Sequence, residues 1–206
     1  MGTIQQTGDF LLPIHDLYTT ELSVLPIQRI VQETDSMQDN TITVRHSCDT
    51  DINTITAIYA HEVLNGLASF EVVPPDADEM AQRRHNIVQA GYPYLVAAQE
   101  EKIIGYAYAG PYRTRPAYKN TLENSVYVSS TARRNGVGKM LLTELITLCE
   151  QGSWRTIIAI IGDTNNTGSI ELHKSLGFRH VGTIEAAGFK LNRWVDSVIM
   201  QKMLAP

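Results

Sequence analysis

The chain has 206 residues, a formal net charge of −5 and two cysteines. An acidic chain of this length suits one domain with a full core, and it argues against a general nucleic-acid or anionic-membrane surface. Cys48 and Cys149 form no CxxC motif, and they fit reduced thiols in a cytoplasmic protein better than a disulfide framework or a zinc site. No apolar run approaches the ~20 residues of a membrane-spanning helix.

Residues 1–40 are rich in Gln and Thr and have little hydrophobic period. We interpret them as an N-terminal extension, or alternatively as a short helix packed on the domain surface. Residues 41–206 are expected to form the folded domain, in which strands and helices alternate. In chain order, the pattern predicts a strand at 41–45, helices at 49–64 and 76–90, strands at 94–99, 102–109 and 122–128, a helix at 137–151, a strand at 156–161, a helix at 169–176, and strands at 180–186 and 195–203.

Three details of these elements bear on the fold. Asp49 is a candidate N-cap of the first helix. The strand at 156–161 is apolar and rich in β-branched residues, as expected of a strand buried on both faces. Tyr106 and Tyr108 alternate along a strand, and either could belong to the core or to a pocket wall. Together the elements predict an α+β fold, a mixed sheet with helices on both faces.

The stretch from Arg133 to Lys139, RRNGVGK, follows a predicted strand and opens a predicted helix. A helix N-terminus exposes N–H groups without partners and a partial positive charge, so it favours an anion. Gly136 and Gly138 let a phosphate approach the backbone, while Arg134 and its basic neighbours add charge. The glycine spacing matches neither the dinucleotide fingerprint nor the Walker A loop. The alternative is an ordinary tight turn between strand and helix.

The surrounding segment is unusually basic. Residues 113–139 contain six of the 17 lysines and arginines and a single acidic residue, Glu123. A local positive region in an acidic chain favours a small anionic ligand over an extended polyanion. Glu123 is therefore a candidate catalytic base, and the alternative is an ion-pair partner of Arg113 or Arg115.

The motif Arg133-x-x-Gly136-x-Gly138 resembles the pyrophosphate-binding loop, (R/Q)xxGx(G/A), of the GCN5-related N-acetyltransferases. Within that superfamily, residues 42–200 are most similar to the phosphinothricin and methionine sulfone or sulfoximine acetyltransferases. The stretches that carry the similarity are YPYLVAA at 92–98, GYAYAGPYRTRPAY at 105–118, LENSVYVS at 122–129, IAIIG at 158–162, LHKSLGF at 172–178 and GTIEAAGFK at 182–190. The resemblance implies two splayed parallel strands at the centre of the sheet, acetyl-coenzyme A as the acetyl donor, no metal ion, and a homodimer.

The resemblance also implies catalytic residues. An α-ammonium group must lose a proton before it can attack a thioester, and the family makes Glu123 the general base for that step, through a water. His173 lies where many superfamily members carry a tyrosine that protonates the leaving thiolate. We expect a catalytic helper at His173 and leave its direction of proton transfer open.

Two groups of binding residues follow. The donor would be held by backbone N–H groups near Val126 and Val128, by the loop from Arg133 to Lys139, and by Asn165 or Asn166 on the pantetheine arm. The acceptor's carboxylate, phosphinate or sulfone oxygens suit the forked guanidinium groups of Arg113 and Arg115, which would lie on one side of an extended segment. By resemblance, Phe70 and Tyr118 would line the rest of the acceptor pocket.

Three functions fit these residues. The first is acetyl transfer from acetyl-coenzyme A to the α-amine of a small amino-acid analogue, by direct attack. The second keeps the donor and uses another amine, such as a polyamine or a peptide N-terminus, although Arg113 and Arg115 argue against a cationic acceptor. The third is a non-catalytic acyl-coenzyme A-binding module, which would not need Glu123 and His173 together.

Overall fold

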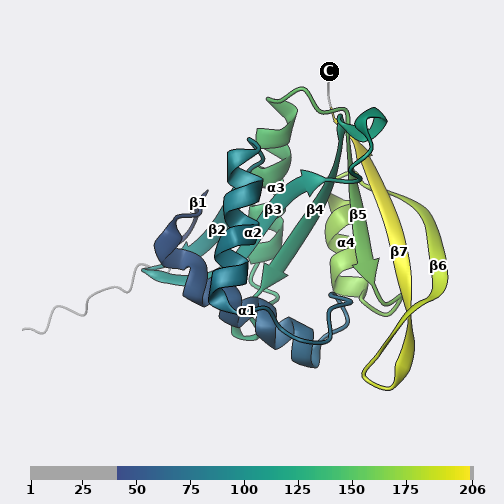
Figure 1. Ribbon diagram of the computed structural model, residues 1–206, viewed down its shortest axis with the longest axis horizontal. Helices are drawn as coiled ribbons and strands as arrows, with labels where there is room; N and C mark the ends of the chain where they lie inside the picture. The colour runs from purple at the N-terminus through teal and green to yellow at the C-terminus, as the bar shows by residue number, and fades with distance from the viewer. Residues whose placement is uncertain (1–40, 205–206) are drawn as a thin grey trace, which may run out of the picture. The chain divides into compact units, whose positions relative to one another are not determined.

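The computed structural model describes residues 41–204 (Figure 1). The predicted N-terminal extension, 1–40, lies outside the described residues. The elements follow in the order β1 (Ile42–His46), α1 (Ile52–Asn65), α2 (Ala77–Gln89), β2 (Tyr94–Gln99), β3 (Lys102–Pro111), β4 (Thr121–Val128), α3 (Val137–Glu150), β5 (Thr156–Gly162), α4 (Thr167–Ser175), β6 (Arg179–Lys190) and β7 (Arg193–Met203). None of these helices is long and apolar enough to span a membrane.

The strands form one mixed sheet of seven in the order β1-β2-β3-β4-β5-β7-β6. All neighbouring strands are antiparallel except β4 and β5, which are parallel. The pairing of β4 with β5 ends at Asn124↔Ala159, whereas β4 continues to Val128. The two central strands therefore part after Asn124, and the predicted mixed sheet with splayed strands is confirmed.

Alternation along β2 builds a core on each face of the sheet. Tyr94, Val96 and Ala98 pack in the cluster that includes side chains of α1 and α2. Leu95 and Ala97 pack in the cluster that includes those of α3. Successive side chains of a strand point to opposite faces, so α2 and α3 cover opposite sides of the sheet, as Figure 1 shows.

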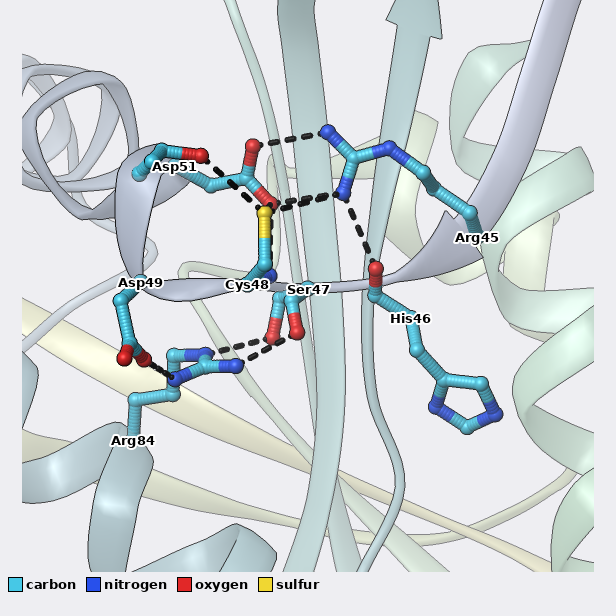
Figure 2. A network of polar contacts seen from close by, with 8 residues as sticks. Arg45, His46, Ser47, Cys48, Asp49, Asp51 and Arg84 are labelled. Atoms are coloured by element: carbon cyan, nitrogen blue, oxygen red, sulfur yellow. Dashed lines mark hydrogen bonds and ion pairs between the residues drawn. The ribbon is translucent and has the colours of Figure 1, made fainter.

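The N-cap expectation for Asp49 is wrong. A 3-10 turn at Asp49–Asp51 precedes α1, and Asp49 pairs instead with Arg84 of α2 at 2.6 Å (Figure 2). The carboxylate of Asp51 accepts two hydrogen bonds of 2.8 Å from Arg45 and one of 2.8 Å from the backbone N–H of Cys48. Burial of this carboxyl raises its pKa, but these donors outweigh burial and lower it. Arg45 of β1 and Arg84 of α2 thus bind the two carboxylates that precede α1.

The final hairpin is longer than predicted, because β6 runs over 179–190 and β7 over 193–203. Leu191 and Asn192 join them with φ of +50° and +58°, as in the type I′ turns that suit the twist of a hairpin. The pairing of β6 with β7 slips between Ile184 and Gly188. The small residues of this irregular stretch concealed the second half of β6 from the sequence pattern.

Candidate active site

Two adjoining cavities lie where β4 and β5 part. The larger has a volume of about 660 Å³ and is lined by the segment Arg133–Lys139, so we name it the loop cavity. The smaller has a volume of about 450 Å³ and is lined by Glu71 and Glu123, so we name it the carboxylate cavity. Residues that line both are Ala68, Val126, Tyr127, Asn166 and Ser169.

The loop cavity has the geometry of an anion site. Gly136, at the N-cap of α3, has a φ of +79°, a left-handed conformation that favours glycine. A Cβ on Gly138 would lie 3.2 Å from the side chain of Leu172 and 3.7 Å from that of Val128. Glycine is therefore favoured at 136 by the backbone conformation and at 138 by the close neighbours.

Of the three basic side chains that line the loop cavity, only Arg133 has an ion-pair partner among the described residues. Nη2 of Arg133 lies 2.6 Å from Oε2 of Glu62, near the end of α1. Oε1 of Glu62 also accepts a 3.4 Å hydrogen bond from the backbone N–H of Ala68. Arg134 and Lys139 have no ion-pair partner between residues 41 and 204, so their charges are available to an anionic ligand.

Backbone donors face the gap between the central strands. The backbone N–H of Tyr112 donates to the carbonyl of Thr121, and that of Ser129 donates to the carbonyl of Ile104. Because hydrogen-bonded and non-hydrogen-bonded pairs alternate along an antiparallel ladder, the odd-numbered residues of β4 form the hydrogen-bonded pairs with β3. The N–H groups of even-numbered residues consequently point toward β5. For Val126 and Val128 these donors lie beyond the last β4–β5 pair. Both valines line the loop cavity.

Glu123 lies in the carboxylate cavity without an ion-pair partner among the described residues. Burial raises the pKa of its carboxyl, and the charge of Arg113 lowers it by a smaller amount. The ion-pair alternative for Glu123 is therefore not realised within 4 Å, although Arg113 is near enough to act through space. Burial of this kind makes a carboxylate a stronger base than one in water.

His173 is buried, with an exposed fraction of 3%, and lines the carboxylate cavity. Its Nδ1 lies 2.8 Å from the carbonyl oxygen of Ser169, and its Nε2 lies 3.0 Å from Nδ2 of Asn124. Burial lowers the pKa of the imidazole, and the bond to Ser169 offsets only part of this effect. A lowered pKa favours the neutral ring at pH 7.

The loop that follows α1 brings Phe70 to the carboxylate cavity. Ser69 anchors the loop, because its carbonyl accepts a 2.6 Å hydrogen bond from Nζ of the buried Lys190 and its hydroxyl lies 2.9 Å from the Tyr59 hydroxyl. A Cβ on Gly188 would lie 2.5 Å from the Phe70 ring. Phe70 is thus seated on the backbone of β6.

The structure brings together most of the predicted site residues and leaves three apart. Glu123, His173, Phe70, Asn165, Asn166 and the residues of β4 and the 133–139 loop line the two cavities. Arg113, Arg115 and Tyr118 are exposed in the segment between β3 and β4 and line neither cavity. This segment is not a strand: it contains a 3-10 turn at 116–118, and the Arg113 guanidinium stacks 4.3 Å from the Tyr112 ring centroid.

Of the two alternating tyrosines, Tyr106 is fully buried in the core and Tyr108 lines the carboxylate cavity. Asn165 donates to Asp163 at 3.2 Å, and Asn166 accepts from Ser169 N–H at 3.3 Å as the N-cap of α4. Sequence reasoning missed several lining residues, among them Tyr59, Glu62, Glu71 and Asn124. The helix and loop of the first three carry no motif, whereas Asn124 could have been noticed beside Glu123.

Comparison with known proteins gives this site its context. Residues 44–199 match the acetyltransferase (GNAT) domain family. The chain is a GNAT acetyltransferase. It is 52% identical over 162 residues to a phosphinothricin N-acetyltransferase of Alcaligenes faecalis, a match that covers 79% of this chain and 82% of that protein.

Two further relatives support the same assignment. An L-methionine sulfoximine/L-methionine sulfone acetyltransferase of Salmonella typhimurium is 33% identical, with 79% of this chain and 95% of that protein covered. The crystal structure of a phosphinothricin acetyltransferase from Sinorhizobium meliloti in complex with AcCoA matches with a TM-score of 0.78 and 44% identity, over 80% of this chain and 89% of that one. The GNAT protein is thus an N-acetyltransferase, and acetyl-coenzyme A is its acetyl donor.

The loop cavity fits this donor. A pyrophosphate needs backbone donors, positive charge and room to approach, and the GNAT chain offers all three at Gly136, Gly138, Arg134 and Lys139. Among residues 41–204, no group of three or more His, Cys, Asp or Glu side chains is placed to hold a metal ion.

Proposed function

We propose that this GNAT acetyltransferase acetylates the α-amine of a small amino-acid analogue of the phosphinothricin or methionine sulfone and sulfoximine type. The observation that carries the proposal is the position of Glu123, a half-buried carboxylate without an ion-pair partner among residues 41–204, in a cavity that adjoins the donor site. The names of the two relatives support this acceptor class.

Glu123 acts as the general base. A water between its carboxylate and the acceptor carries the ammonium proton to it, and the free amine then attacks directly. Acetyl-coenzyme A supplies the activated acetyl group. The N–H groups of Val126 and Val128, which point into the gap between β4 and β5, hold the pantetheine arm and polarise the thioester carbonyl.

The rest of the donor is assigned to the loop cavity. The pyrophosphate lies against Gly136 and Gly138, with Arg133, Arg134 and Lys139 nearby, and the pantetheine arm passes Asn165 or Asn166. On the acceptor side, Phe70 forms one wall. Arg113, Arg115 and Tyr118 bind the anionic or dipolar far end, which is supported by the influence of Arg113 on the carboxyl of Glu123.

We also propose that the protein is a homodimer that associates through the β6–β7 hairpin. β6 is one of the two edge strands of the sheet, and its hairpin exposes a group of large apolar side chains, namely Val181, Ile184, Phe189, Leu191 and Trp194. An exposed edge with an apolar surface is commonly covered by a partner. Light scattering should give twice the chain mass, and a monomer mass would contradict the dimer.

One observation favours a second acceptor class. The lining of the carboxylate cavity includes Glu71 and Glu123 and, among the described residues, no lysine or arginine. Such a lining favours a cationic amine, for example a polyamine or a peptide N-terminus. The charge of Glu71 is partly met by Arg83 at 2.7 Å, so this second candidate rests mainly on Glu123.

A competition assay separates the candidates. Phosphinothricin, methionine sulfone, methionine, spermidine and a short peptide are supplied at equal concentration with acetyl-coenzyme A, and each acetylated product is quantified. The proposal expects phosphinothricin and the sulfone to dominate. Acetylation of spermidine or peptide ahead of both analogues would assign the site to the cationic class.

A further inference from the structure

Asn124 is an unexplained polar group at the centre of the site. It is the last residue of β4 that pairs with β5, its exposed fraction is 6%, and it lines the carboxylate cavity. Its Nδ2 is engaged with His173, but its Oδ1 is buried and has no hydrogen-bond partner among residues 41–204. Buried acceptors are normally satisfied, so this oxygen calls for a donor that arrives with the substrate.

His173 fixes which way the amide faces. The Ser169 carbonyl 2.8 Å from Nδ1 can only accept a hydrogen bond, so Nδ1 carries the ring proton. The neutral ring then presents a lone pair at Nε2. Only the Nδ2 group of Asn124 can face that lone pair, because Oδ1 in its place would set two acceptors 3.0 Å apart. Oδ1 is thereby turned away from the ring.

We propose that Oδ1 of Asn124 accepts a hydrogen bond from the acceptor's amine, and that His173 is the positioning residue that holds this amide rather than an acid for the leaving thiolate. The inference rests on the proposed function, because it needs an amine acceptor in the carboxylate cavity. In this arrangement, the only ring N–H of His173 is bound to Ser169 and the ring's lone pair at Nε2 is bound to Asn124.

The amide oxygen acts on the step that forms the new bond. After Glu123 has taken the ammonium proton through water, the amine nitrogen bonds to the acetyl carbon, the C–S bond breaks, and the proton that the nitrogen sheds passes through water to the leaving thiolate. The nitrogen becomes more positive as the C–N bond forms. A remaining N–H that donates to Oδ1 is therefore bound more strongly in the transition state than in the ground state.

The first experiment reads the tautomer directly. Long-range ¹H–¹⁵N correlation spectra of the full chain with ¹⁵N-labelled histidine, with and without acetyl-coenzyme A, should show His173 as a neutral Nδ1–H ring at pH 7. An imidazolium or an Nε2–H ring would overturn the proposal. Ser169→Ala is the matched control: it removes a hydroxyl 3.5 Å from Nδ1 and keeps the carbonyl, so the tautomer should be unchanged.

The second experiment is a double-mutant cycle on kcat. Asn124→Leu should lower kcat by roughly 10- to 100-fold, with acetyl-coenzyme A affinity unchanged. His173→Phe should lower kcat by a similar or smaller factor, and the double variant should be no slower than Asn124→Leu. Losses that multiply would show that His173 acts independently, and full turnover in Asn124→Leu would exclude the role of Oδ1.

The outcomes are separable from those of the proposed function. A wild-type protein that acetylates only spermidine or peptide contradicts the proposed acceptor class, and the cycle is then run with the amine that reacts. The tautomer spectrum needs no turnover, so it decides the orientation of Asn124 even if a variant fails to fold.

Discussion

The loop cavity and the carboxylate cavity adjoin, yet backbone groups define the first and side chains define the second. The loop cavity depends on backbone: two glycines, a helix N-terminus and the free N–H groups of β4. The carboxylate cavity depends on side chains, above all the half-buried Glu123 and the buried Asn124 and His173. The first should therefore be damaged by adding atoms, and the second by exchanging a functional group at constant shape.

The largest effect is expected from Glu123→Gln, which keeps shape and removes the base. We expect kcat to fall by roughly 10²–10⁴-fold, the usual contribution of a general base, while donor affinity is unchanged. Burial raises the pKa of Glu123, so wild-type kcat should fall as the pH drops through a value above the ordinary glutamate range. Steady-state kinetics against pH would measure both, and a variant with most of its turnover would make Glu123 structural.

Gly138→Val tests the backbone side of the comparison. Even a Cβ at this position meets Leu172 at 3.2 Å, and a branched side chain also occupies the approach to the helix N-terminus. We expect the KM for acetyl-coenzyme A to rise by roughly 10- to 100-fold, as for lost hydrogen bonds to a charged group, with little change in acceptor KM. Unchanged affinity for acetyl-coenzyme A in a folded Gly138→Val protein would show that the pyrophosphate does not bind at this loop.

Arg113→Ala and Arg115→Ala test whether the exposed arginines belong to the carboxylate cavity. In the wild type, methionine sulfone and phosphinothricin should exceed methionine in kcat/KM by roughly 10-fold or more, because a guanidinium facing a bare thioether lacks a partner. Each variant should lower that ratio, because it should reduce kcat/KM for phosphinothricin and methionine sulfone and leave kcat/KM for methionine unchanged. A ratio that both variants preserve would place the two arginines outside the acceptor site.

The smallest effect is expected from Gly188→Ala, which would displace the Phe70 side chain that lines the carboxylate cavity. The new Cβ would lie 2.5 Å from the Phe70 ring, and such overpacking costs about 1 kcal/mol of folding free energy. Acceptor KM should rise and donor KM should not. Gly182→Ala in the same strand is the matched control, since no atom lies within 4 Å of its Cβ. Equal changes in acceptor KM in the two variants would show that Phe70 is not part of the acceptor site.

The same contrast explains what the sequence could predict. Every strand and helix was anticipated from a local pattern of apolar residues, except for the second half of β6. The loop at 133–139 was recognisable because its parts are contiguous. The carboxylate cavity draws on α1, its following loop, β3, β4 and α4, so Tyr59 and Glu71 had no local signal. The N-cap prediction at Asp49 failed because a 3-10 turn with a capping box between Cys48 and Asp51 precedes α1, and because the carboxylate of Asp49 pairs with Arg84 of α2.

Gly162, the last residue of β5, lines the loop cavity beside Leu67. A Cβ there would lie 1.9 Å from the Leu67 carbonyl oxygen and 3.4 Å from Cα of Ala68. The path of residues 67 and 68 along the loop cavity is therefore compatible with glycine alone at position 162. Homologous sequences can be divided by the residue at this position. Those with any residue other than glycine must have a different backbone path at 67 and 68, and therefore a differently shaped loop cavity.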